Sequence, residues 1–326
     1  MIDALGRLTA LLEAELKATN EAIIARMDSP VALIPQLAAH IVAAGGKRMR
    51  PLLTLATAKL CGYQGGRQVQ LAACVEFIHT ATLLHDDVVD ESLLRRGFAS
   101  ANAVFGNKAS VLVGDFLFSR AFELMVEDGS LDVLRILSSA SATIAEGEVL
   151  QLTTQNDIST TADKYFDVIR GKTAALFAAA AEVGGVIAGI GAEECAALRH
   201  FGMDLGMAFQ LVDDALDYAA DQAELGKTVG DDFREGKLTY PVILALAEAT
   251  PEERAFWVRT LEQSEQTEAD LATAFELIGK YDATARTIAR ADQFIDSAVS
   301  MLSRFPQSDM RVALADVARY TTARRH

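Results

Sequence analysis

The chain contains few of the residues that cross-link small or secreted proteins. Its 326 residues include only three cysteines, Cys61, Cys74 and Cys195, which lie far apart and form no Cys-x-x-Cys pair. This spacing excludes a disulfide framework and a zinc ribbon, and it favours the reducing cytoplasm as the setting. With 51% apolar residues, a chain of this length can bury a core without such cross-links.

Positive charge is also scarce. The chain has 30 Lys and Arg residues against 45 Asp and Glu residues, which gives a net charge of -15. Nucleic-acid and anionic-membrane binders need a basic surface, so neither kind of partner is expected. The acidic excess suits a protein that gathers divalent cations. No export signal is expected at the N-terminus, because Asp3, Glu13 and Glu15 interrupt its apolar run.

Uninterrupted apolar runs long enough to cross a membrane are lacking as well. The most apolar window, from Ala174 to Ala192, consists mostly of Ala and Gly and contains Glu182, which favours a buried core helix. Proline is absent between Pro51 and Pro241. Helices tolerate such an absence and loops rarely show it, so the middle of the chain is expected to be helical.

Apolar residues recur with the helical period along most of the chain. The first such stripe follows steps of three and four through Ile2, Leu5, Leu8, Leu12 and Leu16. Similar stripes run through Leu52–Leu60, Val69–Asp90, Ser110–Val126, Leu131–Thr153, Thr161–Ile187, Glu193–Tyr218 and Pro241–Ala249. The Gly-containing breaks between them are short, so no interdomain linker is expected. The sequence predicts one all-α domain over residues 1–326, built as a helical bundle.

The two sharpest motifs are clusters of aspartate. Both read Asp-Asp-x-x-Asp, from Asp86 to Asp90 and from Asp213 to Asp217, and both lie in apolar helical sequence. On a helix, the first and last Asp of each cluster share one face about 6 Å apart. Carboxylates in that setting repel one another and lose hydration unless a hard divalent cation compensates them. A solvated helix end can explain one cluster, but two identical clusters favour magnesium sites.

Cationic residues accompany the first cluster. Lys47 and Arg50 follow a Gly-Gly pair, and Arg95 and Arg96 come shortly after Asp90. Singly, each pair is ordinary helix-end charge. Together, in an acidic protein, they suggest a site for more than one phosphate group. His79 lies two turns before Asp86, although a lone His on an apolar helix is more often a core residue.

Further cations lie near the second cluster. Gly171-Lys172-Thr173 resembles the tail of a P-loop, but Phe166 stands where that motif needs Gly, so a Walker A motif is rejected. Lys227 and Lys237 follow the second cluster in a Gly-rich segment. Glycine-hinged lysines beside a metal site suit a lid over phosphates, and solvated loop charges are the alternative.

In order and spacing, these motifs resemble the trans-isoprenyl diphosphate synthases, and among them the bacterial long-chain synthases that make octaprenyl and decaprenyl diphosphate. The resemblance covers residues 45–241. It rests on the two aspartate clusters and on the segments Gly-Gly-Lys-Arg-Met-Arg-Pro (45–51), Leu-Arg-Arg-Gly (94–97), Gly-Asp-Phe-Leu-Phe-Ser-Arg-Ala-Phe (114–122), Glu-Gly-Glu-Val-Leu-Gln-Leu (146–152), Gly-Lys-Thr-Ala (171–174) and Gly-Lys-Leu-Thr-Tyr-Pro (236–241).

The resemblance implies a bundle of about a dozen helices around a deep central cavity, usually as a homodimer. It implies a prenyltransferase that condenses an allylic diphosphate, such as farnesyl diphosphate, with several isopentenyl diphosphates, using about three Mg2+ ions per active site. The product would pass to membrane enzymes as a quinone side chain, for ubiquinone. The released diphosphate would remove the proton, so neither His79 nor His85 is expected to act as a base.

Site roles follow from the resemblance, residue by residue. Asp86, Asp90, Asp213 and Asp217 are implied to bind the metal, the second pair facing the first, and with Lys172 they are implied to carry the catalysis. Isopentenyl diphosphate would be held by Lys47, Arg50, His79 and Arg96. The allylic diphosphate would be held by Arg95, Lys172, Thr173, Gln210, Lys227 and Lys237.

Product length is implied by two small residues. Bulky residues five and four positions before the first Asp block the product tunnel in short-chain relatives, and this chain has Ala81 and Thr82 there. A tunnel open past Ala81 predicts a long product of about C40 to C50, with octaprenyl favoured. A shorter C15 to C20 product and a non-catalytic partner subunit of a heteromeric synthase are the alternatives. Such a subunit is expected to lose an aspartate cluster, and this chain keeps both.

Three other classes fit the sequence less well. A class-I terpene cyclase uses similar acidic chemistry but has no need for a second diphosphate site. A carboxylate di-iron bundle needs two Glu-x-x-His motifs, and the chain has one, from Glu76 to His79. A phosphohydrolase built on His85-Asp86 leaves the second aspartate cluster unexplained.

Overall fold

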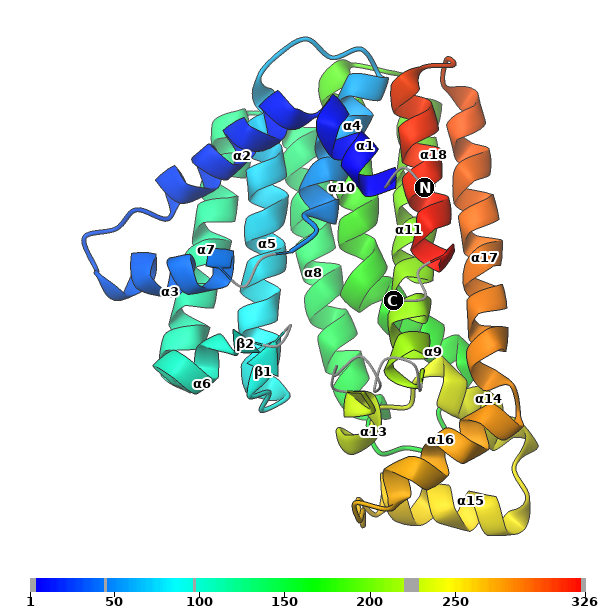
Figure 1. Cartoon of the computed structure of the whole chain (residues 1–326). Coiled ribbons are helices and arrows are strands. Elements are labelled where there is room, and N and C mark those ends of the chain that lie inside the picture. Colours follow the sequence, from blue (N-terminus) through cyan, green and yellow to red (C-terminus); the bar gives the residue numbers. More distant parts are fainter. Residues whose placement is uncertain (1–3, 44–45, 96–97, 220–228, 324–326) are drawn as a thin grey trace. The chain divides into compact units, whose positions relative to one another are not determined.

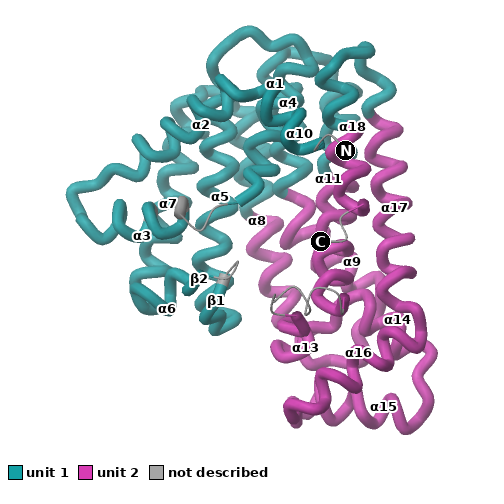
Figure 2. Tube along the Cα trace, in the orientation of Figure 1, with its two compact units in different colours: residues 1–141, 176–202, 302–314 teal, residues 142–175, 203–301, 315–326 magenta. Residues whose placement is uncertain are grey.

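The computed structural model describes residues 4–43, 46–95, 98–219 and 229–323. Among these residues, β-structure is limited to the short antiparallel hairpin of β1 (Leu94–Arg95) and β2 (Phe98–Ala99). The rest of the regular structure is helical, so the predicted all-α fold is confirmed (Figure 1). The chain forms two compact units, each assembled from three stretches (Figure 2): residues 1–141, 176–202 and 302–314 in unit 1, and residues 142–175, 203–301 and 315–326 in unit 2.

The predicted apolar stripes coincide with the main helices. The N-terminal half contains α1 (Ala4–Leu11), α2 (Glu13–Arg26), α3 (Leu33–Ala43), α4 (Met49–Leu60), α5 (Arg67–Val89), α6 (Ala101–Phe105), α7 (Asn107–Asp128) and α8 (Leu131–Thr154). The middle contains α9 (Ala162–Ile169), a π-helical turn η1 (Arg170–Ala174), α10 (Ala175–Ala188) and α11 (Ala192–Asp217). The C-terminal part contains α13 (Asp231–Arg234), α14 (Tyr240–Glu248), α15 (Pro251–Trp257), η2 (Val258–Glu262), α16 (Asp270–Lys280), α17 (Ala283–Met301), η3 (Leu302–Arg304) and α18 (Asp309–Ala323).

Helix α5 lies at the core of unit 1, beside α2, α4 and α7 (Figure 1). It is buried along most of its length because it is apolar on nearly every face, from Leu71 to Leu84. Small residues let α10 approach α4 closely: a Cβ on Gly184 would lie 2.6 Å from the backbone nitrogen of Ala58. The Thr54 hydroxyl donates to the carbonyl of Ala180 at 3.0 Å across the same contact.

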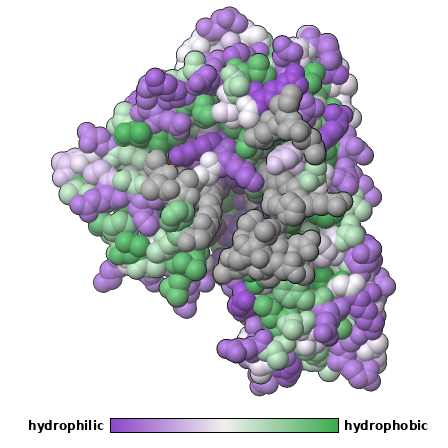
Figure 3. Space-filling model, viewed as in Figure 1, coloured by the Kyte–Doolittle hydropathy of each residue, from purple (hydrophilic) through white to green (hydrophobic). Residues whose placement is uncertain are grey.

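The surface of unit 1 exposes several large apolar side chains. On α7, Leu112, Phe122 and Val126 are 66%, 45% and 67% exposed. Figure 3 shows further hydrophobic residues over α6 and the β1–β2 hairpin, where Val104 and Phe98 are exposed. Large apolar patches on a surface mark interaction sites more often than chance.

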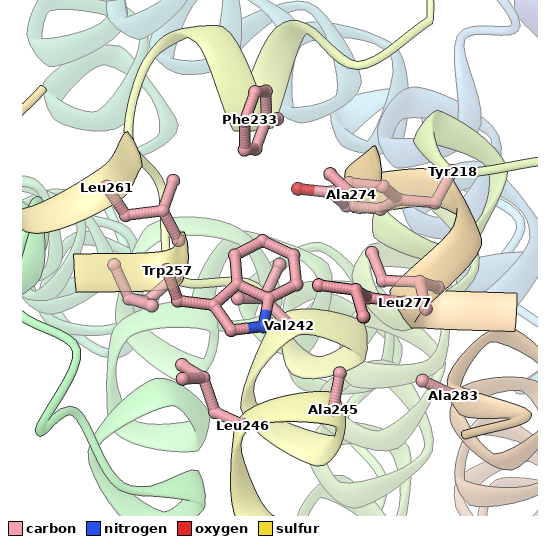
Figure 4. Close-up of a cluster of buried hydrophobic side chains, with 12 residues drawn as sticks. Tyr218, Phe233, Val242, Ala245, Leu246, Trp257, Leu261, Ala274, Leu277 and Ala283 are labelled. Carbon is pink, nitrogen blue, oxygen red and sulfur yellow. The ribbon is translucent and has the colours of Figure 1, made fainter. Parts of the chain in front are cut away.

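Unit 2 contains an apolar cluster in the segment that follows Pro241. The indole ring of Trp257 is fully buried and lies among side chains from α13, α14 and η2, including Phe233, Val242 and Leu261 (Figure 4). Thr250 and Glu253 begin α15 with a reciprocal pair of hydrogen bonds between side chain and backbone. The described contacts of this segment are thus those of a packed apolar core.

The predicted core helix lies in the most apolar part of the chain. Residues Ala162–Ala188 are long and apolar enough to cross a membrane, but 78% of their most apolar window is buried inside the protein. Phe177 and Val183 are fully buried there. The expectation of a buried core helix is therefore confirmed.

Close packing at Gly202 should be sensitive to a single methyl group. A Cβ on Gly202, in α11, would lie 2.4 Å from the carbonyl oxygen of Phe177 and 2.8 Å from Cα of Ala178. Gly202→Ala should therefore lower the free energy of unfolding by about 1–3 kcal/mol, measured by urea denaturation. Gly279→Ala is the matched control, because Gly279 is helical with no atom within 4 Å of its Cβ position. The control should be neutral or stabilising by up to about 1 kcal/mol, and equal losses in the two variants would contradict this prediction.

Candidate active site

The first aspartate cluster forms the C-terminal end of α5. The amide of Asp90, the helix C-cap, donates to the carbonyl of Asp86 at 2.7 Å, so the two residues lie one turn apart. Both side chains are half-buried, whereas Asp87 is only 2% exposed. The end of a helix is the negative pole of its dipole, so carboxylates there are destabilised unless a cation offsets them.

The turn after α5 is held by side chains of α6 and its cap. The side-chain amide of Asn102 donates to the backbone carbonyls of Asp87 and Ser92, at 3.0 and 3.1 Å. The hydroxyl of Ser100 donates to the same Ser92 carbonyl at 2.7 Å. These bonds satisfy carbonyls that the helix end leaves open. They also fix the start of the β1–β2 hairpin next to the aspartates.

Two of the residues predicted to hold isopentenyl diphosphate meet in unit 1. The guanidinium of Arg50 donates to Nε2 of His79 at 3.0 Å, and its Cζ atom lies 4.4 Å from the ring centre of Phe177. Lys47 is exposed in the segment just before α4. Arg48, which lies between Lys47 and Arg50 in the sequence, forms an ion pair with the buried carboxylate of Glu76. Arg48 is thus engaged in the core, while Arg50 and His79 form one cationic group.

His85 packs against α7. Its Nε2 atom donates to the carbonyl of Val111 at 3.2 Å and lies 3.4 Å from Oδ1 of Asp115. The ring stacks on Phe118 with centroids 6.1 Å apart. Gly114 makes room for it, because a Cβ there would lie 2.3 Å from His85 Nε2. His85 therefore has a packing role at the contact between α5 and α7.

The second aspartate cluster forms the C-terminal end of α11 and belongs to a polar network in unit 2. The hydroxyl of Thr173 donates to Oε1 of Gln210 at 2.8 Å, and the Gln210 amide donates to Oδ1 of Asp214 at 2.7 Å. The hydroxyl of Tyr165 donates to Oδ2 of the same carboxylate at 2.5 Å. The predicted residues Thr173 and Gln210 are therefore brought together, and two further residues, Tyr165 and Asp214, hold them in place.

Asp217 binds the backbone of the segment that follows. Its Oδ1 atom accepts from the amides of Gly230 and Asp231, at 3.0 and 3.3 Å, and its Oδ2 atom accepts from the amide of Asp232 at 3.0 Å. Asp213 lies one turn before Asp217 on α11, with an exposed side chain. The two predicted ligands thus have different surroundings: Asp213 faces outward, and Asp217 organises the start of α13.

At this end of unit 2, burial disfavours the ionised form of three aspartates. It raises the pKa of Asp214 to about 7, against the opposing hydrogen bonds from Tyr165 and Gln210. It raises the pKa of Asp217 to about 6, although three backbone amides oppose the shift. Burial also raises the pKa of Asp232, and the charges of Asp214 and Asp217 add to that effect. Carboxylates held this close together favour binding of a cation.

Two of the three predicted lysines that the structure describes, Lys172 and Lys237, lie beside a glutamate. The ammonium of Lys172 donates to Oε2 of Glu148 at 2.7 Å. The Nζ atom of Lys237 lies 2.5 Å from Oε2 of Glu235. Three other predicted positions are not described at this level: Arg96 and Lys227 lie outside the described residues, and of Arg95 only the backbone, in β1, is described.

Residues missed by the sequence analysis differ in the signal they carried. Asp214 lies inside a recognised motif, so the motif itself was the signal, and its side chain is buried. Tyr165 carried no signal, because 49 residues separate it from the aspartate it contacts. Glu148 lay in the Glu-Gly-Glu segment, which had no assigned chemistry.

The aspartates fit a magnesium ion that relies on additional ligands. Within the described part of the chain, no group of three or more His, Cys, Asp or Glu residues is arranged to hold a metal. Each cluster instead supplies a pair of carboxylates one helical turn apart, with hard oxygen donors. Magnesium takes few protein carboxylates and completes its shell with phosphate and water, so this donor set suits it.

The raised pKa of Asp214 predicts a pH dependence of stability. The folded chain binds the proton more tightly than the unfolded chain, whose ordinary pKa is 3.8, so the stability contributed by this group is lost as pH rises toward about 7. In EDTA, the urea midpoint of the wild type relative to Asp214→Asn should therefore fall between about pH 4 and pH 7 and level off above pH 7. Asp292→Asn, on an exposed position of α17, is the control and should run parallel to the wild type. A parallel profile for Asp214→Asn would contradict the shift.

Comparison with known proteins identifies the family. The sequence profile of polyprenyl synthetases matches residues 31–278. The octaprenyl diphosphate synthase of Escherichia coli (strain K12) is 46% identical over 320 residues, which cover 98% of this chain and 99% of that protein. Two crystal structures match with a TM-score of 0.95 and 52% identity.

The first of these structures is a decaprenyl diphosphate synthase from Rhodobacter capsulatus, with 98% of each chain covered. The second is a polyprenyl synthase from Caulobacter crescentus CB15 complexed with calcium and isoprenyl diphosphate, with 99% of this chain and 98% of that chain covered. The profile spans most of the chain and the relatives match it nearly from end to end, so this chain belongs to the polyprenyl synthetase family.

Proposed function

We propose that this chain is a trans-polyprenyl diphosphate synthase that extends an allylic diphosphate with several isopentenyl diphosphates to a long all-trans product. One observation carries the proposal: two Asp-Asp-x-x-Asp clusters each occupy the C-terminal end of a long, apolar helix, α5 or α11. The negative end of a helix is an unfavourable place for three aspartates unless a cation is bound there. The identity to an octaprenyl diphosphate synthase supports the same reaction.

The described residues suit the binding of two diphosphates. In unit 1, Lys47 and the Arg50–His79 pair would hold isopentenyl diphosphate. In unit 2, Lys172, Lys237 and the Thr173–Gln210 pair would hold the allylic diphosphate. Arg95, Arg96 and Lys227 would complete these sets. Asp86, Asp90, Asp213 and Asp217 would hold magnesium, and Asp217 would do so while it orders the start of α13.

Ionisation of the allylic C–O bond leaves a carbocation and a diphosphate anion. Bound magnesium would stabilise the anion as a Lewis acid. The lysines and arginines would hold the leaving diphosphate in place and offset its charge. The apolar Ala- and Leu-rich helices would keep water from the carbocation. A base from the protein is not required, because the released diphosphate can accept the proton, and His79 and His85 are engaged with Arg50 and α7.

The product is proposed to be about C40 to C50, with octaprenyl favoured, and to serve as a quinone side chain of the ubiquinone type. Ala81 is fully buried in α5 and Thr82 is half-buried, with its hydroxyl donating to the carbonyl of His79 at 2.7 Å. Both side chains are small, so neither would project far into the path proposed for a long tail. The named relatives that make octaprenyl and decaprenyl diphosphate support this length.

The cellular setting and assembly are proposed to be those of a cytoplasmic homodimer that works as a single catalytic domain over residues 1–326. The exposed apolar side chains of α7 support the dimer. Phe122 and Val126 lie one turn apart on its surface and are 45% and 67% exposed. A second copy of the same helix would bury both. The product, being strongly apolar, would then pass to enzymes at a membrane.

The direct test of the reaction is product analysis. Purified protein with farnesyl diphosphate, labelled isopentenyl diphosphate and Mg2+ should yield one long polyprenol after dephosphorylation, and EDTA should abolish it. Asp86→Ala and Asp213→Ala should each lower turnover by at least about 100-fold, because each removes charge that holds the metal. Asp292→Ala should not change turnover. A folded wild type without incorporation would favour a non-catalytic partner subunit.

Product length can be tested at Ala81. Ala81→Phe should shorten the main product by several isoprene units, because a phenyl ring would project where the tail is expected to pass. Chromatography of the polyprenols measures the change directly, independently of the amount of active enzyme. Ala81→Ser should retain the wild-type length. An unchanged distribution in a folded Ala81→Phe variant would refute the tunnel assignment, and a wild-type product of C15 to C20 would identify a short-chain synthase.

A further inference from the structure

The Glu146-Gly147-Glu148 segment of α8 has no role in the reaction as proposed, yet it lies against Lys172. The Nζ atom of Lys172 donates to Oε2 of Glu148 at 2.7 Å, and the two side chains are 20% and 26% exposed. Glu146, two residues earlier on the same helix, is exposed. The two glutamates therefore differ: one meets the lysine and the other faces solvent.

Two glycines bring the backbone of α8 against the turn that carries Lys172. A Cβ on Gly147 would lie 2.5 Å from the backbone nitrogen of Lys172, and a Cβ on Gly171 would lie 3.0 Å from Cα of Gly147. The turn itself, η1, is π-helical, an uncommon geometry that is found preferentially at functional sites. The close approach and the π turn together place the lysine side chain within reach of Glu148.

An ion pair of this kind restricts a side chain that is otherwise highly mobile. A free lysine samples many rotamers, and ordering it on ligand binding reduces affinity. Its ammonium has three donors, so one can remain on the glutamate while the others reach phosphate oxygens. Because the pair is largely buried, it is less screened than a surface pair.

The second predicted lysine of unit 2 is arranged in the same way. Lys237 and Glu235 are paired at 2.5 Å, with side chains 18% and 27% exposed. The segment that carries them contacts the residues just after α8, because the side-chain amide of Gln155 donates to the backbone carbonyl of Glu235 at 2.6 Å. The amide of Asn156 donates to the carbonyl of Gly236 at 3.0 Å. Two lysines at separate points of the fold are thus each held by a glutamate.

We propose that Glu148 is a positioning residue: it holds the ammonium of Lys172 where an allylic diphosphate binds, so that the lysine is ordered before the substrate arrives. Glu235 has the same task for Lys237. The inference rests on the proposed role of Lys172 in binding the allylic diphosphate. It assigns the Glu-Gly-Glu segment a function, with Gly147 providing the close approach and Glu148 providing the contact.

The test compares the KM values of the two substrates in Glu148 variants of the full-length protein with Mg2+. Glu148→Ala should raise the KM for farnesyl diphosphate by about 5- to 10-fold, because an ordered charge-assisted contact is lost. The KM for isopentenyl diphosphate should change less than about 2-fold, since its proposed ligands lie in unit 1. Glu148→Gln should stay near the wild type, because its amide oxygen still accepts from Lys172. Glu146→Ala is the matched control and should change neither value.

Each other outcome overturns the inference. Equal KM values for Glu148→Ala and Glu146→Ala would show that the pair positions nothing. Tighter binding of farnesyl diphosphate by Glu148→Ala would show that the glutamate competes with the substrate. Equal rises in both KM values with a lower melting temperature would indicate a structural role alone. Lys172→Ala separates the two proposals: an unchanged KM for farnesyl diphosphate in that variant would refute the role of Lys172 itself.

Discussion

Repulsion among aspartates at the ends of two helices is the constraint on which the rest of the structure depends. Asp86 and Asp90 end α5, and Asp213 and Asp217 end α11, at the pole of each helix that disfavours negative charge. In the α11 cluster, burial raises the pKa of Asp214 and Asp217, as expected for desolvated carboxylates that lie close together. Such a cluster fits the cation site proposed above, and the two helices hold its carboxylates one turn apart.

The surrounding polar groups reduce the destabilisation of the carboxylates and fix their orientation. Tyr165 and Gln210 donate to Asp214, and three backbone amides donate to Asp217. Each donor stabilises a carboxylate and also fixes its orientation. The ammonium of Lys172 is stabilised in the corresponding way, because it donates to the carboxylate of Glu148. This end of unit 2 thus combines opposite charges, in which carboxylates accept from donors and a lysine donates to a glutamate.

Glycine and alanine make these contacts possible. Gly147 and Gly171 bring two backbones together behind Lys172, and Gly114 makes room for His85. Around Gly184, α4 and α10 approach so closely that a methyl group would meet backbone. The Ala- and Gly-rich window of the chain was recognised as a buried helix from composition, but its exact neighbours depend on which small residues face one another.

The sequence by itself determined the all-α fold, the approximate extents of α4, α5, α7, α8, α11 and α14, and the placement of both aspartate clusters on helices. These features depend on the period of apolar residues and on spacing within one helix, which are local properties. The family motifs likewise pointed to Arg50, His79, Thr173 and Gln210. Only the tertiary structure showed that Arg50 meets His79, that Arg48 pairs with Glu76 and that Asp217 binds the amides of residues 230–232. Those contacts join residues 13 to 29 positions apart, and Tyr165 is 49 positions from Asp214, so their pairing follows from how helices pack and not from any local pattern.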